Sequence, residues 1–255
     1  MYDEALRFYQ DAVTEAKSIK NNEGVISTQV NYLAGILFKK GDYDKAEPLY
    51  RDAISIKSKL YGQEHPKVTS LKVNLASLLR AKKKYQEAYL MFRKCIKLQR
   101  NHQNTHALAR TFNSFALCLK EMGRYEKAEK YYNFSLEIRR KLPRDDYNIA
   151  ETLGNLGVLI GMIGDYKRAE PYLREALAIK ERINDKNPSF AIAINNLAKN
   201  LWKQGHVENA EKEFRRAISI LETTLGNDCK HPCLEEVRAN LTGLLKKKRQ
   251  HISAH

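Results

Sequence analysis

The chain has 255 residues and a formal net charge of +15 at neutral pH, with 43% hydrophobic and 29% charged residues. This composition excludes a wholly disordered protein, because it supplies enough apolar side chains for a core. No apolar run approaches the roughly 20 residues that a membrane-spanning helix needs, and four cysteines are too few for a disulfide scaffold. Met1 is not followed by the basic and apolar stretches of a signal peptide, so we expect a cytoplasmic location.

A pattern of residues recurs about every 41 residues along the chain. Each copy has Leu-Ala or a close equivalent, and glycine in most copies eight residues after the Leu. A tyrosine follows two residues later, except in the fifth copy, which has Val207; an alanine comes three residues after that and a small residue seven later. The copies are anchored by Leu33, Leu75, Phe115, Leu156 and Leu197. Five copies in one register predict a repeat architecture.

Within each copy, apolar and small residues fall at helical spacing on both sides of the glycine, which predicts two amphipathic helices, here called helix A and helix B. In the first copy Leu33 and Leu37 mark helix A, and Leu49 and Ile54 mark helix B. We expect full repeats at residues 27–66, 69–106, 109–147, 150–188 and 191–232. A single hairpin cannot bury its apolar faces, so the copies should stack into one all-α, right-handed superhelical solenoid of antiparallel helix pairs over residues 1–255.

The two ends of the array differ from the full copies. Tyr2 and Ala5 match the start of a helix B, so residues 1–24 are expected to form a partial first repeat. Its apolar residues would need cover, from a longer protein or from self-association. Residues 233–250 restart a helix A and should cap the array, leaving a tail at 251–255.

The turn after helix A has one departure from the pattern. Four copies place glycine there, where a left-handed backbone conformation is needed, but the second copy has Lys83. That conformation costs a residue with a side chain about 1 kcal/mol. We therefore expect the second turn to be the weakest.

These copies resemble the tetratricopeptide repeat, in the long form of about 42 residues found in kinesin light chains and in nephrocystin. Residues 41–50 and 164–173, Gly-Asp-Tyr-Asp-Lys-Ala-Glu-Pro-Leu-Tyr and Gly-Asp-Tyr-Lys-Arg-Ala-Glu-Pro-Tyr-Leu, carry the resemblance most clearly. It covers essentially the whole chain. It implies a noncatalytic scaffold or adaptor that binds protein partners in a groove lined by A helices. A cargo adaptor and a ciliary or signalling platform both fit, so the cytoplasmic location includes association with the cytoskeleton or a cilium.

The resemblance also implies which side chains contact the partner. The position just before Leu-Ala faces the groove, and four of its six occurrences are asparagine, whose amide can pair with any extended peptide backbone. Arginine and lysine further along helix A would select acidic side chains or a terminal carboxylate. The predicted peptide-binding residues are Asn74, Arg80, Arg110, Asn113, Asn155, Asn195, Asn196, Lys199, Trp202, Lys203 and Asn240. In the alternative interpretation the asparagines brace neighbouring helices and Trp202 is half-buried.

The sequence has no phosphate-binding glycine loop, nucleophile elbow or His-Glu-x-x-His motif, so we expect no enzyme activity, small-molecule substrate or cofactor. Cys229, His231 and Cys233 are residue types that bind zinc, but they supply at most three ligands. The His-Pro pair at 231–232 also repeats His-Pro at 65–66, which explains the histidine without a metal. We favour a plain loop here over a metal site or a local disulfide.

The positive charge allows a second class of function, a basic solenoid that binds RNA or an anionic membrane surface. The basic clusters lie at residues 82–84, 139–141 and 246–249, in different parts of the repeats. Because no single face gathers them, we favour acidic protein partners over nucleic acid or membrane. Self-association through the incomplete first repeat is compatible with either function.

Overall fold

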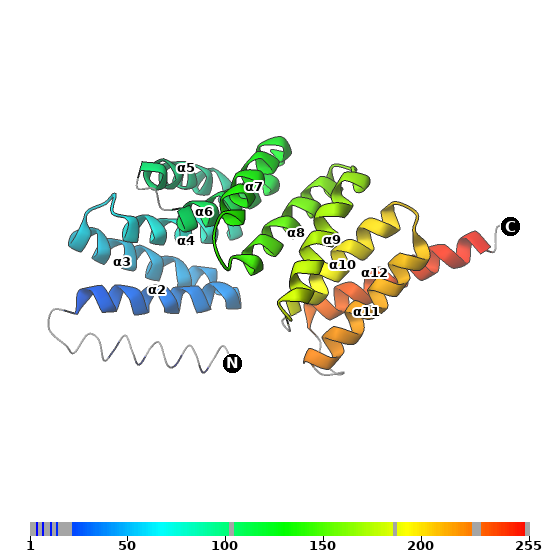
Figure 1. The fold of residues 1–255 in the computed structure, drawn as a ribbon. Helices are drawn as coiled ribbons and strands as arrows, with labels where there is room; N and C mark the ends of the chain where they lie inside the picture. The colour runs from blue at the N-terminus through cyan, green and yellow to red at the C-terminus, as the bar shows by residue number, and fades with distance from the viewer. Residues whose placement is uncertain are drawn as a thin grey trace. The chain divides into compact units, whose positions relative to one another are not determined.

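The computed structural model describes residues 22–101, 105–185, 188–225 and 231–252, and positions 4, 7, 11 and 14 before them. Within these residues every regular element is an α-helix. The chain divides into two compact units, residues 1–131 and 132–255. In each unit, successive helices lie side by side and are joined by short connections (Figure 1). The expected all-α fold of paired helices is confirmed.

The helices alternate between the two predicted types. The first unit contains α2 (Glu23–Lys40), α3 (Tyr43–Tyr61), α4 (Pro66–Ala81), α5 (Tyr85–Asn101), α6 (Thr105–Glu121) and the start of α7 (Tyr125–Arg140). The second unit contains the rest of α7, α8 (Asp146–Met162), α9 (Tyr166–Arg182), α10 (Pro188–Lys203), α11 (Val207–Leu225) and α12 (Pro232–Ile252). The even-numbered helices are the A helices and the odd-numbered ones are the B helices.

Small residues at the repeat positions allow the helices of a pair to pack closely. Ala34 of α2 and Ala46 of α3 are fully buried, as are their counterparts in the other copies. Apolar side chains also connect neighbouring copies, since Val30 of α2, Ala53 of α3 and Leu71 of α4 form one buried cluster. Each copy therefore completes the core of its neighbour, as expected for stacked repeats.

The turn between helices A and B has the same geometry with and without glycine. Gly41 has φ 92° and donates its N–H to the carbonyl of Phe38 at 3.1 Å. Lys83 has φ 61° and donates its N–H to the carbonyl of Arg80 at 2.9 Å. The second copy thus keeps the left-handed turn with a residue that disfavours it. The lower stability of this turn stays a prediction.

Two A helices begin with the same histidine cap. The Nδ1 atom of His65 accepts a hydrogen bond from the N–H of Lys67 at 3.1 Å, and Nδ1 of His231 accepts from the N–H of Cys233 at 3.3 Å. A proline follows each histidine at the first helical position, where its missing N–H costs nothing. Capping explains why the His-Pro pair recurs. Cys229, the remaining member of the zinc hypothesis, lies outside the described residues.

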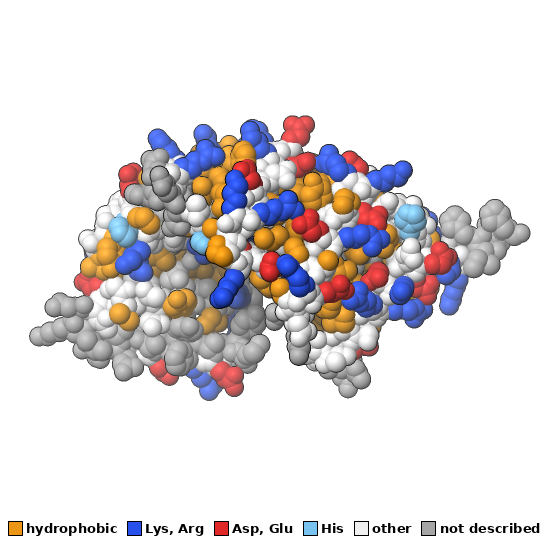
Figure 2. Space-filling view, viewed as in Figure 1, with side chains coloured by type: hydrophobic (Ala, Val, Ile, Leu, Met, Phe, Trp, Pro, Cys, Tyr) orange, Lys and Arg blue, Asp and Glu red, His pale blue; other side chains and the backbone are white. Residues whose placement is uncertain are grey.

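Positive and negative side chains are mixed on the molecular surface. Figure 2 shows Lys and Arg side chains interspersed with Asp and Glu on the face in view. Some cations are not on the surface at all: Arg139 pairs with Asp145 at 3.0 Å, and Lys180 pairs with Asp185 at 3.0 Å, with all four side chains buried. Each of these buried pairs is neutral overall, so the net charge of +15 is carried by the other side chains.

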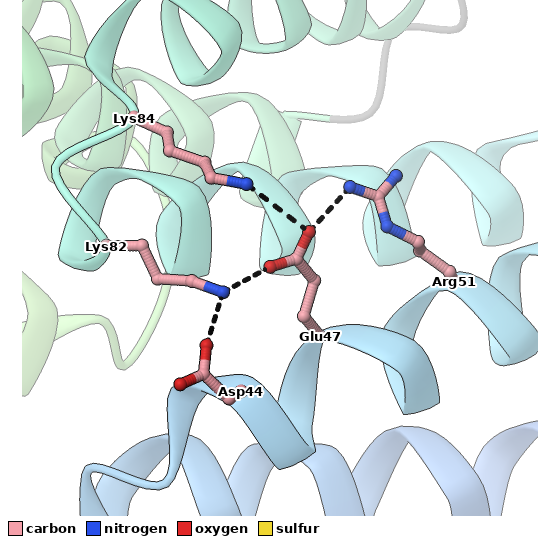
Figure 3. Close-up of polar contacts among 5 residues, drawn as sticks. All are labelled: Asp44, Glu47, Arg51, Lys82 and Lys84. Atoms are coloured by element: carbon pink, nitrogen blue, oxygen red, sulfur yellow. Dashed lines mark hydrogen bonds and ion pairs between the residues drawn. The ribbon is translucent and has the colours of Figure 1, made fainter.

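A carboxylate early in helix B links each of several copies to the next. Glu47 of α3 accepts from Lys82 of the following copy at 2.7 Å and from Arg51, one helical turn later, at 2.6 Å (Figure 3). The same arrangement joins Glu170 to Gln204 and Arg174, and Glu211 to Lys248 and Arg215. We call this arrangement the inter-copy clasp. In the second copy Tyr89 replaces the acid, and the guanidinium groups of Arg93 and Arg124 lie over its ring at 5.7 and 5.0 Å.

Candidate functional site

All of the predicted binding residues lie on A helices. In the first unit they are Asn74 and Arg80 on α4, with Arg110 and Asn113 on α6. In the second unit they are Asn155 on α8, Asn195, Asn196, Lys199, Trp202 and Lys203 on α10, and Asn240 on α12. The predicted residues therefore form two groups, one in each unit.

Two of the asparagine positions form braces between consecutive A helices. The Nδ2 of Asn74 donates to Oδ1 of Asn31 on α2 at 3.0 Å. The Nδ2 of Asn240 donates to Oδ1 of Asn195 on α10, also at 3.0 Å. In both pairs, an asparagine just before the Leu-Ala position bonds to an asparagine one residue earlier in the preceding A helix. These four amides hold the helices in register, as the alternative interpretation predicted for the asparagines.

The predicted cations of the first unit are in polar surroundings. The guanidinium group of Arg80 donates to the carboxylate of Glu121 on α6, which offsets its charge. Arg110 is exposed and lies near the buried hydroxyl group of Tyr50. Burial raises the pKa of Tyr50 to about 12, and the positive charge of Arg110 opposes part of that rise.

A pocket of about 290 Å³ lies in the second unit between α8 and α10. Its amide and ammonium groups come from α10 alone: Asn196, Lys199, Asn200 and Lys203. Its apolar lining is supplied by α8 and α9, through Gly157, Val158, Gly161, Met162, Tyr166 and Leu173. The lining has two ammonium groups and two amides and contains no acidic residue. We call this site the α8–α10 pocket.

Glycine residues of α8 give the pocket its space. A Cβ atom at Gly161 would meet nothing closer than Nδ2 of Asn200 at 3.7 Å. The other copies carry large side chains at this position, Phe38, Arg80, Lys120 and Trp202. A side chain of that length on α8 would extend into the space of the pocket.

Asn200 was not predicted as a site residue, although it lines the pocket. Its side chain is only 5% exposed, and its Oδ1 accepts from Gln204 at 2.8 Å. The Nδ2 lies toward Gly161 and has no hydrogen-bond acceptor among the described residues. The absence of a large side chain at position 161 is the signal in the sequence that could have located this donor.

The two lysines of the pocket differ in their contacts. The Nζ of Lys199 lies 3.4 Å from Oε1 of Glu236 on α12, in an exposed and long ion pair. That carboxylate also accepts from Asn195 at 3.4 Å. Lys203 is exposed and has no ion-pair partner in the part of the chain that the structure describes. Exposed pairs of this kind contribute only about 0–1 kcal/mol, so Lys199 can exchange Glu236 for another carboxylate at low cost.

Trp202 lies outside the α8–α10 pocket. Its ring packs edge-to-face on Phe214, with ring centroids 6.4 Å apart, and a Cβ atom built at Gly243 of α12 would lie 3.3 Å from the ring. It lines a separate pocket of about 590 Å³ with Leu244 and Lys247. Trp202 is half-buried, so the structure separates it from the other predicted residues of α10.

Paired helices with a repeating core and an A-helix pocket define a class, the α-helical repeat proteins. A family model described as tetratricopeptide repeat matches residues 24–101 and 107–182, and a second model with the same description matches residues 190–228. The chain therefore belongs to the tetratricopeptide repeat family, which forms scaffolds for protein–protein interaction.

Similar solved structures support the same fold. The chain is 26% identical to BtubC (BKLC) from P. vanneervenii, with a TM-score of 0.73 over 91% of this chain and 94% of that one. It is 18% identical to the repeats of a putative kinesin light chain of Podosopora anserina, with a TM-score of 0.61 over 77% and 95% of the two chains. Rap protein complexed with Competence and Sporulation Factor is 20% identical, with a TM-score of 0.70 over 92% and 69%. The resemblance to the long kinesin-light-chain type of repeat is confirmed.

Curated relatives match a smaller part of the chain. Human tetratricopeptide repeat protein 19, mitochondrial, is 28% identical over 116 residues, which are 45% of this chain and 29% of the relative. The rat protein of the same name gives the same identity over 30% of its length. The chain thus spans less than a third of these relatives. They are named mitochondrial, so the cytoplasmic location stays a prediction, and no described helix is long and apolar enough to cross a membrane.

Proposed function

We propose that the chain is a noncatalytic scaffold that binds extended, acidic peptide segments of partner proteins in the α8–α10 pocket. The observation that carries this proposal is the chemistry of the lining. Asn196, Lys199, Asn200 and Lys203 supply its amide and ammonium groups, and the lining contains no acidic residue. A ligand that offers backbone amides and carboxylates complements both kinds of group.

The amides would hold the main chain of the peptide. Asn196 is half-buried and keeps a donor and an acceptor at the pocket, so it can bond to a peptide N–H and C=O together. The Nδ2 of Asn200 adds a donor whose position is fixed by the bond between its Oδ1 and Gln204. A donor that is already fixed loses little entropy when it binds.

The lysines would select acidic side chains, and the apolar wall would accept one hydrophobic side chain. Lys199 and Lys203 can each pair with a ligand carboxylate, since the contact of Lys199 with Glu236 is long and exposed. Val158, Met162 and Leu173 form the apolar side of the same pocket. The net charge of +15 would speed the approach of an acidic segment, and this effect would weaken as salt increases.

A peptide array near physiological salt tests this function. The unaltered chain would be compared with a variant that carries Asn196→Ala and Lys203→Glu. The control is Lys212→Glu, because Lys212 is exposed on α11 and the charge change at each lysine is the same. Circular dichroism would first establish that all three are folded.

We expect acidic peptides to be lost by the pocket variant and kept by the control. Loss of roughly 10-fold or more in affinity corresponds to about 1.4 kcal/mol, the size of one charge-assisted contact. Equal weakening in both variants would mean that net charge alone drives binding. Retention of RNA by all three, with a steep salt dependence, would instead support the nucleic-acid alternative.

A further inference from the structure

A second pocket, of about 420 Å³, lies in the first unit where α2 and α4 end and their partner helices begin. Its charged lining residues are Lys39, Arg80, Lys83 and Glu121. Tyr43 and Tyr85 also line it, together with Phe38 and Ala81. We propose that this pocket binds a phosphate monoester, independently of the peptide site proposed on α8 and α10.

Lys83 is placed at this pocket by an unfavourable backbone conformation. Its φ of 61° lies in the left-handed region, where the four other copies have glycine. The lysines on either side point elsewhere: Lys82 and Lys84 both approach Glu47, at 2.7 and 3.9 Å (Figure 3). Lys83 alone of the three lines the pocket between α2 and α4. Strained backbone conformations that persist in a fold often occur at functional sites. The position of Lys83 in the lining of a pocket makes ligand binding the function that fits this strain.

The cations of the pocket are available to a ligand. Within the described chain, Lys39 and Lys83 have no ion-pair partner. Arg80 contacts Glu121 through Nη1, so its other N–H groups can still donate. Tyr43 and Tyr85 are half-buried and can each donate a hydroxyl hydrogen. The pocket thus has more donors than its own acceptors can use.

The charge of the pocket matches one phosphate group. Three cations and one carboxylate, Glu121, leave a net charge of about +2. A phosphate monoester carries about −1.5 to −2 at neutral pH and has three terminal oxygen atoms that accept hydrogen bonds. A ligand with a single carboxylate carries only −1 and would leave about half of the pocket's positive charge unpaired.

Acidic residues around the pocket disfavour a long polyanion. Asp44, in the first turn of α3, accepts from Lys82 at 2.6 Å, and its side chain is still 92% exposed. Glu87 lines a neighbouring pocket together with Lys83 and Lys84. RNA or an anionic membrane would bring further phosphates against these carboxylates, whereas one monoester would not. We therefore infer an isolated phosphate group as the ligand, on a peptide or on a small soluble molecule.

The test is a calorimetric titration of the chain at low salt with four probes. They are a five-residue alanine peptide carrying a central phosphoserine, the same peptide with serine, glucose 6-phosphate and a single-stranded RNA of 20 nucleotides. The decisive variant is Lys83→Gly, since glycine suits the left-handed turn. The control is Lys127→Ala, which removes an exposed lysine of α7 in the same unit.

We expect Lys83→Gly to weaken phosphoserine-peptide binding by about tenfold or more, which is the worth of one charge-assisted contact. The same variant should raise Tm by about 2–4 °C, because glycine relieves the strained turn, so lost binding cannot be assigned to unfolding. Lys127→Ala should change neither value. Stronger binding of the phosphopeptide than of glucose 6-phosphate would assign the group to a peptide, and equal binding would assign it to a small phosphate.

Three results would overturn the proposal. The first is binding of the serine peptide as tight as that of the phosphoserine peptide. The second is unchanged phosphopeptide affinity in Lys83→Gly. The third is a preference for the RNA over the phosphopeptide, with RNA binding weakened equally by Lys83→Gly and Lys127→Ala. That result would mean that binding is due to a nonspecific basic surface. None of these experiments depends on the α8–α10 pocket, so the outcome is separate from the proposed peptide site.

Discussion

The close approach of α9 to Gly157 of α8 gives a sharp test of the packing. Every other copy has alanine after the anchoring apolar residue, but the fourth has Gly157. A Cβ atom built there would lie 2.7 Å from Cγ of Leu173, 2.8 Å from its Cδ2 and 3.3 Å from the carbonyl oxygen of Ala169. Non-bonded carbon atoms normally keep about 3.5–4.0 Å. Because Leu173 is only 3% exposed and Ala169 contributes its backbone, neither can move freely.

The expected cost follows from two opposing terms. Overpacking of a core contact destabilises a protein by about 1–3 kcal/mol. Replacing glycine by alanine within a helix stabilises it by about 0.8–1.0 kcal/mol. Gly154 lies on the same helix, and a Cβ there would meet nothing within 4 Å. Gly154→Ala therefore measures the helix term alone, and Gly157→Ala should be less stable than Gly154→Ala by about 1–3 kcal/mol.

Urea unfolding followed by circular dichroism would measure this difference. Equal stabilisation by both variants would refute the reasoning, since it would mean that α8 and α9 separate without cost. A rescue experiment is available because the residue that faces position 157 is aromatic in the other copies: Tyr50, Phe92, Tyr132 and Phe214. The double variant Gly157→Ala with Leu173→Phe reproduces that combination and should recover part of the loss.

Three further predictions concern polar contacts. Hydrogen bonds from Lys82 and Arg51 lower the pKa of Glu47 to about 2, so its stabilisation is complete above its ordinary value near 4.5 and is lost as the pH falls toward 2. This shift corresponds to at most about 3 kcal/mol of unfolding free energy, and solvent screening reduces it to about 1–2 kcal/mol. In acid unfolding, Glu47→Gln should therefore cost that amount at pH 7 and almost nothing near pH 2. A cost that does not depend on pH would contradict this prediction. His65→Ala should lower stability by about 1 kcal/mol through loss of the cap, whereas His65→Asn should not, and equal Tm values for the two would argue against capping. Lys180→Ala should lower the free energy of unfolding by about 3–5 kcal/mol in urea, because it leaves Asp185 buried without its cation. Adding Asp185→Ala should restore part of the loss. No recovery in the double variant would show that the loss of the pair is not the cause.

Much of the fold could be predicted from the sequence because the signals are local and repeated. Helical spacing identifies the helices, and the glycine at the end of helix A identifies the turn through its positive φ. Lys83 departs from that rule, yet the chain keeps the turn at this residue. The hydrogen bonds of the turn and the packed helices on both sides outweigh the preference of one residue.

The asparagines show where the sequence is insufficient. An asparagine on the inner face of an A helix suits a peptide ligand and suits a neighbouring helix equally well. The choice depends on a residue more than forty positions away, as for Asn74 with Asn31 and Asn240 with Asn195. Whether these amides can form a hydrogen bond depends on the distance between consecutive A helices. A single sequence does not give that distance.

Both candidate sites lie where one copy departs from the others, and this has a physical cause. Positions shared by every copy are fixed by packing, because each copy presents the same surface to its neighbour. A residue that departs from the shared pattern either does not take part in this packing or is held against its own conformational preference. Gly161 leaves space beside α8 at a position where the other copies have large side chains, and Lys83 places a cation where the other copies have glycine. Comparing the copies position by position within one chain can therefore locate a pocket even when the family pattern locates only the fold.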